Sequence, residues 1–145
     1  MDRLFLIARI ADQRVAVPAD LVESVIELTE VTPVPRVASH IAGLSALRSR
    51  VITVIDSRAA LGLPPIEAAP IRQAVVAVID GHSYGLIADE VEDVTTSLRD
   101  PLPVTGAVAG GWRPVTTAMV EIEGDLLPLI DIAILIAGLA IRQAA

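Results

Sequence analysis

Two aspartates stand at equivalent places in the chain, and paired carboxylates are the first candidates for chemistry. Asp56 and Asp131 each follow an isoleucine, in "VITVIDSRAALGL" (51–63) and "LLPLIDIAILIAG" (126–138). Two carboxylates that share a proton activate water in aspartic proteases. That chemistry uses Asp-Ser/Thr-Gly turns, whereas "IDSR" and "IDIA" have no glycine. An aspartate between an apolar run and a run of helix formers favours a helix N-cap, so we predict that both are caps.

The other candidates for catalysis or metal binding lack the companions that such sites require. His40 and His82 have neither the i, i+4 spacing nor the neighbouring carboxylates of a metal site, and the chain has no cysteine. The acidic stretch "DEVED" (89–93) lacks the spacing and the glycine of an EF-hand and is typical of a solvated strand face. We therefore expect a protein that is not an enzyme and that uses no metal or other cofactor.

The charge of the chain argues against nucleic acid as a partner. The 145 residues carry a net charge of −7, with seven acids and seven arginines in residues 1–66 and eleven acids and four arginines in residues 67–145. Binding to a phosphate backbone needs clustered cations, and single-stranded nucleic acid also needs aromatic platforms. Aromatic side chains are only 2% of the chain, so we expect no nucleic-acid binding.

The hydrophobic residues predict a packed core rather than a membrane span. The longest unbroken apolar run, Ile132 to Ile141, is well short of the roughly 18 residues that a span needs. The first residues, "MDRLFLIARIADQR", show no secretory signal, and the lack of cysteine fits a reducing compartment. We expect a cytoplasmic protein with no direct membrane insertion.

The two aspartates belong to a longer internal repeat. Residues 5–25 and 74–94 align without a gap at a shift of 69, with seven identities in 21 positions. The Ile-Asp pairs recur at a shift of 75, so six extra residues fall in the second half, most naturally in the Gly/Pro-rich stretch 100–115. The two halves of the chain therefore share one structural plan.

The repeat sets the expected domain organisation. Half-repeats of approximately 1–66 and 71–145, joined by a linker at about 63–70, make up a single domain over residues 1–145. A half of about 70 residues is marginal alone, so we expect the two halves to pack on one another. Two arrangements fit the pattern, one in which each half folds by itself and one in which strands are exchanged between the halves.

Short apolar runs separated by polar turns predict a mostly β protein with four hairpins. The sequence indicates both ends of six of the expected strands: Phe5–Ile10, Ile41–Leu47, Val51–Ile55, Ala74–Ile79, Met119–Ile122 and Leu126–Ile130. A short helix is expected after Asp56 and a longer one from Asp131 to near Gln143. Many short strands with little helix favour small barrels over an α/β sheet.

Two motifs resemble those of one family over residues 4–140. The stretch Gly43 to Asp56 is similar to a G-x-x-N-L-R-G-x-x-x-P-x-x-D hairpin, with the glycine, leucine, arginine and final aspartate kept. A G-x-x-x-D-x-V-x-x-V pattern follows from Gly85 to Val94. In this order and spacing the motifs resemble the CheW family of chemotaxis coupling proteins.

The resemblance implies a CheW-like fold of two five-stranded SH3-like β-barrel subdomains, packed around a shared hydrophobic core with short helices. It also implies a non-enzymatic adaptor that couples methyl-accepting chemoreceptors to the histidine kinase CheA. In the family, the helical hairpin at the receptor's cytoplasmic tip docks between the barrels, and the barrels pair with the kinase regulatory domain.

By position, the resemblance assigns receptor binding to a small set of residues: Arg48, Val22, Gly43, Leu47 and Ser24. For several of these a structural role is the alternative. Val22 is equally suited to a core position, Gly43 to a backbone requirement and Arg48 to a solvated turn. We favour a binding role most clearly for Arg48.

The chain departs from the family pattern near the expected receptor groove. Ala46 and Ser49 replace the usual asparagine and glycine, Thr53 replaces a proline, and Ser24 stands where a glutamate is common. A divergent CheW-like module that binds or inhibits a histidine kinase without the usual receptor contact is therefore the alternative. A small-molecule-binding double barrel would need convergent polar groups that the sequence does not show.

One expectation concerns the turn itself. If the hairpin requires a positive φ at the family's glycine, Ser49 is strained there by about 1 kcal/mol. Ser49→Gly should then raise the thermal midpoint.

Overall fold

The computed structural model describes residues 3–28, 30–64, 72–97, 99–104 and 110–137. In the first half the elements are β1 (Arg3–Ile10), β2 (Gln13–Pro18), η1 (Ala19–Leu21), β3 (Val22–Leu28), β4 (Ile41–Leu47), β5 (Arg50–Ile55) and α1 (Ser57–Ala60). In the second half they are β6 (Arg72–Ile79), β7 (His82–Ala88), β8 (Glu90–Ser97), η2 (Gly110–Val115), β9 (Thr116–Ile122), β10 (Asp125–Ile130) and α2 (Ile132–Ala137). The predicted hairpins are all present.

The central strands of each sheet are buried on both faces, which explains their continuous apolar sequences. Residues 74–77 of β6 are all buried, although successive side chains of a strand point to opposite faces. Val75 and Ala77 pack in the largest core, whereas Ala74 and Val76 pack in a smaller core inside their own sheet. An unbroken apolar run is thus the mark of a strand covered on both sides.

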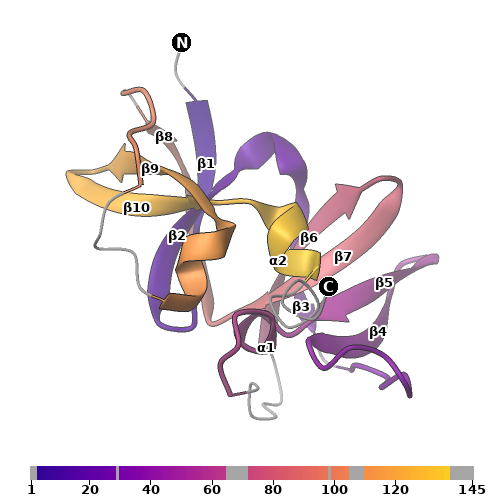
Figure 1. Ribbon diagram of the computed structural model, residues 1–145. Coiled ribbons are helices and arrows are strands. Elements are labelled where there is room, and N and C mark those ends of the chain that lie inside the picture. The colour runs from indigo at the N-terminus through magenta and orange to yellow at the C-terminus, as the bar shows by residue number, and fades with distance from the viewer. Residues whose placement is uncertain (1–2, 29, 65–71, 98, 105–109, 138–145) are drawn as a thin grey trace.

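Each sheet combines strands from both halves of the sequence. Sheet A has the order β8-β1-β2-β10-β9, and sheet B has the order β3-β6-β7-β5-β4. The sequence repeat makes β1 and β2 correspond to β6 and β7. With the strands matched in this way, the two sheets have the same strand order. Each half therefore places its first hairpin among the three later strands of the other half, as Figure 1 shows for β1 and β2 beside β8 and β10.

The exchange is symmetric down to the residue register. In sheet A, Arg3 of β1 pairs with Ser97 of β8, which comes from the second half. In sheet B, Arg72 of β6 pairs with Leu28 of β3, which comes from the first half. These two pairs are related by the shift of 69 that the sequence repeat showed. Neither sheet can form from one half alone.

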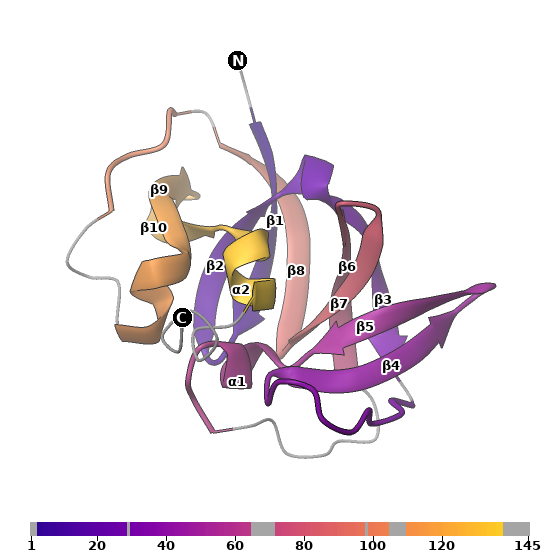
Figure 2. The same ribbon diagram turned by 45° about the vertical axis from the view of Figure 1, so that its right-hand side comes forward.

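One core joins the two sheets and the short helices. Its buried members come from both sheets and from the helical segments: Leu6, Ile10, Val15, Val17, Ile55, Ala60, Leu61, Val75, Ala77, Leu86, Ala88, Trp112, Val115, Met119, Ile130, Ile132 and Leu135. Helix α2 lies between the sheets in both ribbon views (Figures 1 and 2), with Ile132 and Leu135 buried in this core. The shared core is what packs the two halves together.

The repeated aspartates begin the two α-helices. The Asp56 carboxylate accepts a hydrogen bond from the backbone N–H of Ala59 at 3.1 Å. The Asp131 carboxylate accepts from the N–H groups of Ala133 and Ile134 at 2.9 and 3.3 Å. Each side chain thus satisfies backbone donors that have no partner inside the first turn. The predicted end of the second helix, near Gln143, lies outside the described residues.

The predicted fold class is confirmed as mostly β, with two five-stranded sheets in an SH3-like arrangement and few short helices. Most of the linker expected at 63–70 lies outside the described residues. No described helix combines the length and apolar character needed to cross a membrane.

Candidate partner-binding site

The β4–β5 hairpin projects from sheet B and carries Arg48 at its turn (Figure 2). Leu47 pairs with Arg50, so Arg48 and Ser49 form a two-residue loop. Arg48 has a φ of 58°, while Ser49 is not among the residues with positive φ. The expectation that Ser49 carries the left-handed backbone strain was therefore wrong. A two-residue hairpin loop can place its one positive φ at the first central residue, and here that residue is the arginine.

Three of the residues assigned by resemblance come together beside this turn. Ser24, Leu47 and Arg48 line one cavity of about 310 Å³ between β3 and the β4–β5 hairpin. The remaining lining residues are Glu23, Val25, Ile26 and Arg50. We call this space the turn cavity. Its lining is mixed, with aliphatic side chains from Val25, Ile26 and Leu47 and charged groups from Glu23, Arg48 and Arg50.

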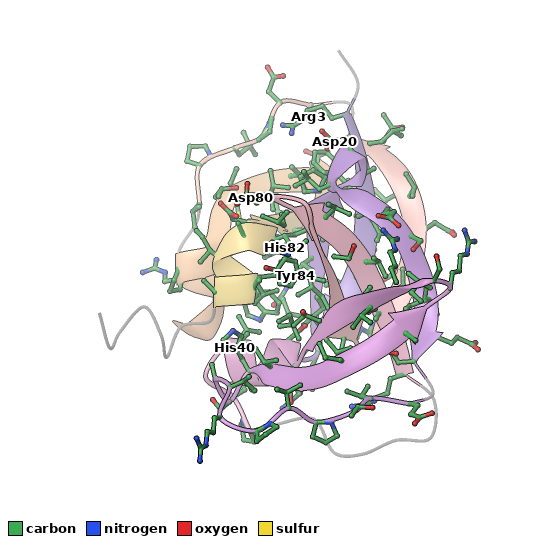
Figure 3. The ribbon with its side chains drawn as sticks, turned by 90° about the vertical axis from the view of Figure 1, so that its right-hand side faces the viewer. Arg3, Asp20, His40, Asp80, His82 and Tyr84 are labelled. Carbon is green, nitrogen blue, oxygen red and sulfur yellow. The ribbon has the colours of Figure 1, made fainter. Side chains whose placement is uncertain are left out.

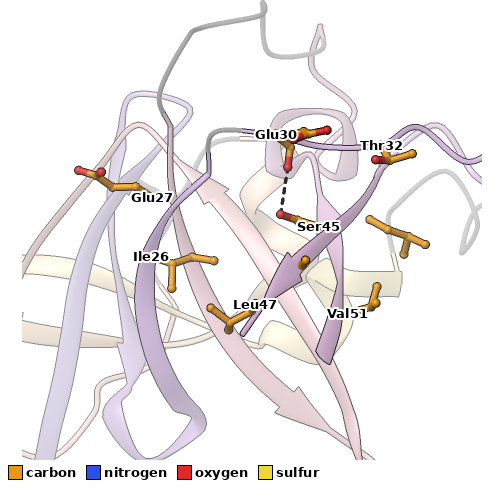
Figure 4. A pocket seen from close by; sticks show the side chains of 9 residues that line it. Ile26, Glu27, Glu30, Thr32, Ser45, Leu47 and Val51 are labelled. Atoms are coloured by element: carbon orange, nitrogen blue, oxygen red, sulfur yellow. Dashed lines mark hydrogen bonds between the residues drawn. The ribbon is translucent and has the colours of Figure 1, made fainter. Parts of the chain in front are cut away.

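A larger cavity of about 530 Å³ continues from the turn cavity along the same gap. Figure 4 shows it between β3 and the β4–β5 hairpin, with Ile26 and Leu47 shared by both cavities. Its other lining residues are Glu27, Glu30, Thr32, Leu44, Ser45, Ala46 and Val51. We call this the edge cavity, because β3 and β4 are the two outer strands of sheet B. The two cavities together form an opening between the outer strands.

The two remaining assigned residues have places outside both cavities. Val22 is half-buried and packs against the shared core. Gly43 is buried and has a φ of 149°, and a Cβ there would lie 2.2 Å from the backbone oxygen of Thr32. The strand segment at Thr32 bonds to β4 at this point, through Thr32 N–H to Leu44 at 2.8 Å. Gly43 therefore has a backbone requirement that no side chain can meet.

The arginines of the locally basic stretch differ in how they are engaged. Arg50 forms an ion pair with Glu23 and donates to the Ser83 hydroxyl at 3.3 Å. Arg58 donates to the carbonyl of Pro64 at 3.2 Å. Arg36 and Arg48 are exposed and form no ion pair with any residue in the described ranges. Arg48 is thus an exposed cation beside a cavity of mixed aliphatic and polar lining, and its donors have no ion-pair partner among the described residues.

A separate cavity of about 410 Å³ lies between α2 and sheet B, on the side labelled by Tyr84 and His40 in Figure 3. His40 is buried at 3% exposure, and its Nε2 lies 2.7 Å from the carbonyl oxygen of Ile136, so this nitrogen carries the proton. His82 is exposed at the start of β7. Arg48 does not line this cavity, so the arginine and the space between α2 and sheet B are different surfaces.

The structure offers no arrangement for catalysis by metal within its described ranges. No group of three or more histidine, aspartate or glutamate side chains there could hold a metal ion. In the acidic stretch 89–93, Glu92 is engaged by Arg14 through two hydrogen bonds of 3.0 and 3.2 Å. The arrangement at β3 and β4 can bind a partner through its aliphatic side chains and through Arg48, for which the described residues offer no ion-pair partner.

Sequence reasoning missed the larger part of the opening. Glu27, Glu30 and Val51 line the edge cavity, and Val51 is 62% exposed. A partial signal was present in β3, "VESVIEL", where the exposed Glu23 and Glu27 alternate with the less exposed Val22, Ser24 and Ile26, although the exposed Val25 breaks the pattern. Such alternation marks a strand with one face in water. That this strand also ends a sheet depends on distant pairing with β6.

The comparisons with known proteins agree on one family. A family model for the CheW-like domain matches residues 4–139. A chemotaxis protein CheW of Rhizobium meliloti is 28% identical over 125 residues, which cover 86% of this chain and 81% of that protein. A chemotaxis protein CheW of Thermotoga maritima is 26% identical over 134 residues, covering 92% and 87%. The crystal structure of the scaffolding protein TtCheW from Thermoanaerobacter tengcongensis has a TM-score of 0.79 at 19% identity, covering 93% of this chain and 88% of that one.

The likeness to the solved structure shows the same fold, and the family model spans both repeats. Proteins of this family are non-enzymatic scaffolds and adaptors of chemotaxis. The caps at the repeated aspartates and the aliphatic opening in sheet B are consistent with such a role. The chain belongs to the family of CheW-like domains.

Proposed function

We propose that this chain couples the helical cytoplasmic tip of a chemoreceptor to the regulatory domain of a histidine kinase of the CheA type. The observation that carries the proposal is Arg48, an exposed arginine at the turn cavity that has no ion-pair partner in the part of the chain that the structure describes. The family supplies the class of function, and the position of Arg48 supplies the contact. A cytoplasmic location follows from these partners.

The turn cavity suits an amphipathic helix with a carboxylate near its contact edge. Leu47, Val25 and Ile26 form an aliphatic wall next to the guanidinium. A helix in a groove is held by apolar side chains, and an arginine fork that meets a carboxylate adds a charge-assisted contact. By family resemblance, receptor tips are rich in glutamate, which complements this cation.

A second, equivalent surface supports binding to the kinase. Val25 and Val51 of sheet B are 39% and 62% exposed, and their repeat equivalents in sheet A, Val94 and Leu126, are 54% and 45% exposed. Exposed aliphatic side chains at equivalent places on both sheets suit burial against another barrel domain. We assign the receptor to the turn of sheet B and the kinase regulatory domain to the surface of sheet A.

The alternative function, kinase binding without the usual receptor contact, is favoured by one observation. Ser24 lines the turn cavity where the family commonly has a glutamate, and Ala46 lines the edge cavity where it commonly has an asparagine. Both side chains are short and leave Arg48 without a carboxylate or amide beside it from those positions. These replacements remove polar groups that the family commonly presents near the receptor contact, which favours the alternative. Arg48, the contact on which the proposal rests, is kept, and for that reason we place receptor binding first.

Separate pull-downs of a receptor tip and of a kinase regulatory domain by the purified chain test the proposal. Binding of both partners is expected. Binding of the kinase domain alone would replace the proposal by the alternative function. Binding of neither would contradict both.

A further inference from the structure

The two sheets are equivalent in strand order and register, but their outer strands are joined differently. In sheet A, the hydroxyl of Ser97 on β8 lies within hydrogen-bonding distance of two carbonyl oxygens, that of Arg99 at 3.1 Å and that of Glu121 on β9 at 3.2 Å. Arg99 also forms an ion pair with Glu121 at 3.3 Å. In sheet B, the equivalents of Ser97 and Glu121 are Leu28 and Ala46, which have no side chain able to form these links. The edge cavity occupies the corresponding gap.

The hairpin registers show which backbone groups face this gap. In an antiparallel pair, alternate residues direct their N–H and C=O toward the partner and away from it. The two-residue loop between Leu47 and Arg50 makes these a hydrogen-bonded pair, so Leu44 and Ala46 direct their groups away from β5. The bonds of Leu44 to Thr32, at 2.8 and 2.9 Å, agree with this assignment. Within the described ranges, Ala46 has no such partner.

The same alternation of backbone directions can be followed across sheet B to β3. The loop after Ile79 makes Ile79 and His82 a hydrogen-bonded pair, so Ala74 and Val76 of β6 face β3. Their partners on β3 are Ile26 and Ser24. Val25 and Glu27 therefore direct their backbone N–H and C=O groups outward, where sheet B has no further strand among the described residues. An edge of this kind is a template for an added strand.

The charges around the edge cavity select the partner. Its charged lining residues are Glu27 and Glu30, and both are exposed. The Glu30 backbone is held against β4, because its carbonyl accepts a hydrogen bond from the Ser45 hydroxyl at 3.0 Å (Figure 4). The floor is aliphatic, from Ile26, Leu47 and neighbouring residues. An extended segment with aliphatic side chains at alternate positions and lysine or arginine beside them matches these features.

We propose that the open edge of β3 in sheet B binds an extended, basic and aliphatic segment of a partner protein by strand addition. The segment pairs with the outward groups of Val25 and Glu27, sets its alternate aliphatic side chains into the edge cavity and places its cations near Glu27 and Glu30. This surface adjoins the Arg48 contact, because the edge and turn cavities share Ile26 and Leu47. The inference uses the backbone edge of β3 and the charges of Glu27 and Glu30, and it does not depend on the proposed receptor and kinase partners.

Three synthetic heptapeptides and the full chain test the proposal by fluorescence anisotropy. The first has valine at alternate positions, threonine between them and lysine at both ends. The second replaces both lysines with glutamate, and the third is the lysine peptide methylated on the backbone nitrogens that would face β3. We expect the lysine peptide to bind roughly tenfold more tightly than the glutamate peptide, since each of the two exposed rim pairs should contribute about threefold. The methylated peptide should not bind measurably.

Variants and amide exchange locate the site. Glu27→Gln and Glu30→Gln should each weaken binding of the lysine peptide by about threefold, whereas Glu90→Gln, an exposed acid on the outer strand of sheet A, should leave it unchanged. Exchange of the Val25 and Glu27 amides should slow when the lysine peptide is added. Equal binding of the methylated peptide, equal binding of the glutamate peptide, or unchanged exchange at both amides would overturn the proposal.

Discussion

The guanidinium of Arg14 on β2 holds the carboxylate of Glu92 on β8 with two hydrogen bonds, from Nε at 3.0 Å and from Nη2 at 3.2 Å. The two residues are 78 positions apart and belong to different repeats. Asp125 of β10 lies 3.4 Å from the same guanidinium. This contact links the first hairpin of the chain, β1–β2, to strands of the second half. These are the strands beside which the hairpin lies in sheet A.

The equivalent cluster in sheet B is built from the same positions with the charges redistributed. Glu23 corresponds to Glu92, Ser83 to Arg14, and Arg50 to Asp125. Arg50 pairs with Glu23 and donates to Ser83 at 3.3 Å. Each sheet thus keeps one arginine–glutamate pair across its exchanged hairpin, with the arginine taken from a different strand.

The first prediction is that Arg14 and Glu92 are energetically coupled. A bidentate pair whose side chains are 29% and 31% exposed should contribute about 1 kcal/mol in a double-mutant cycle of Arg14→Met and Glu92→Gln. The hydrogen bond with Glu92 raises the pKa of Arg14 above its ordinary value. Because the pKa of Arg14 is raised in the folded state, the stability that its charge contributes is present below the unfolded-state pKa and is lost as the pH rises through the raised pKa.

Denaturant unfolding of the four proteins measures this coupling. The Arg99–Glu121 pair is the control, because the Arg99 side chain is 72% exposed and its cycle should give a value near zero. Equal coupling in both cycles would contradict the role of the Arg14–Glu92 pair across the repeats.

Much of the fold could be predicted because local patterns determine the strands. The apolar run at 74–77 and the polar turn after Ile79 specify a hairpin wherever that hairpin is placed. The exchange of hairpins between the halves could not be predicted from local patterns. The hairpin registers are the same in both halves, so these patterns do not distinguish the two possible pairings. Whether β1 pairs with β3 or β8 depends on contacts such as Arg14 with Glu92, which are distant in sequence.

The candidate site was predictable only in part. Arg48 was found through a motif, but its left-handed φ was assigned to Ser49, because the family's glycine suggested that position. The edge cavity was missed because it depends on which strands end the sheet. Val22 has a motif position near the site and yet packs against the shared core.

The second prediction concerns Gly43. A Cβ at this position would lie 2.2 Å from the Thr32 backbone oxygen, and neither backbone can move freely because Leu44 bonds to Thr32. Gly43→Ala should therefore lower the free energy of unfolding by about 1 to 3 kcal/mol, as overpacking does. Thermal melting followed by circular dichroism checks this.

Gly62→Ala is the matched control. Gly62 also has a positive φ, of 79°, but a Cβ there would meet no atom of the described residues within 4 Å. Its substitution should show only the backbone strain of about 1 kcal/mol. If the two variants lower the thermal midpoint by the same amount, the close approach of Gly43 to Thr32 does not contribute to the loss of stability.

The third prediction follows from the corrected turn geometry. Because the positive φ belongs to Arg48, Arg48→Gly should relieve a strain of about 1 kcal/mol and raise the thermal midpoint. Ser49→Gly should leave the midpoint unchanged or lower it slightly. Melting of both variants decides the point, and a stabilising Ser49→Gly with a neutral Arg48→Gly would restore the turn expected from the family.

The fourth prediction is that Arg48 is the main contact for the receptor tip. Arg48→Ala should weaken its binding by about 1 to 3 kcal/mol, as truncation of an interface anchor does. Arg36→Ala is a close control, because Arg36 is also exposed, has a φ of 63° and has no ion-pair partner among the described residues. It should change mainly the on-rate and its salt dependence.

Isothermal titration with a receptor tip, combined with melting curves, separates binding from folding. Both variants should keep the wild-type thermal midpoint within error or exceed it slightly. Normal affinity of Arg48→Ala, together with loss of binding by a change in sheet A, would show that the receptor contact was assigned to the wrong sheet.

The central claim is that this chain joins two partners, and a three-component assembly tests it most directly. A receptor tip fragment, a kinase regulatory domain and the full chain are mixed and separated by size-exclusion chromatography with light scattering. Our account predicts one peak with the mass of all three when the chain is present, and two separate components when it is omitted. If receptor tip and kinase domain compete for the chain, so that only binary complexes elute, the chain does not couple them and the account is contradicted.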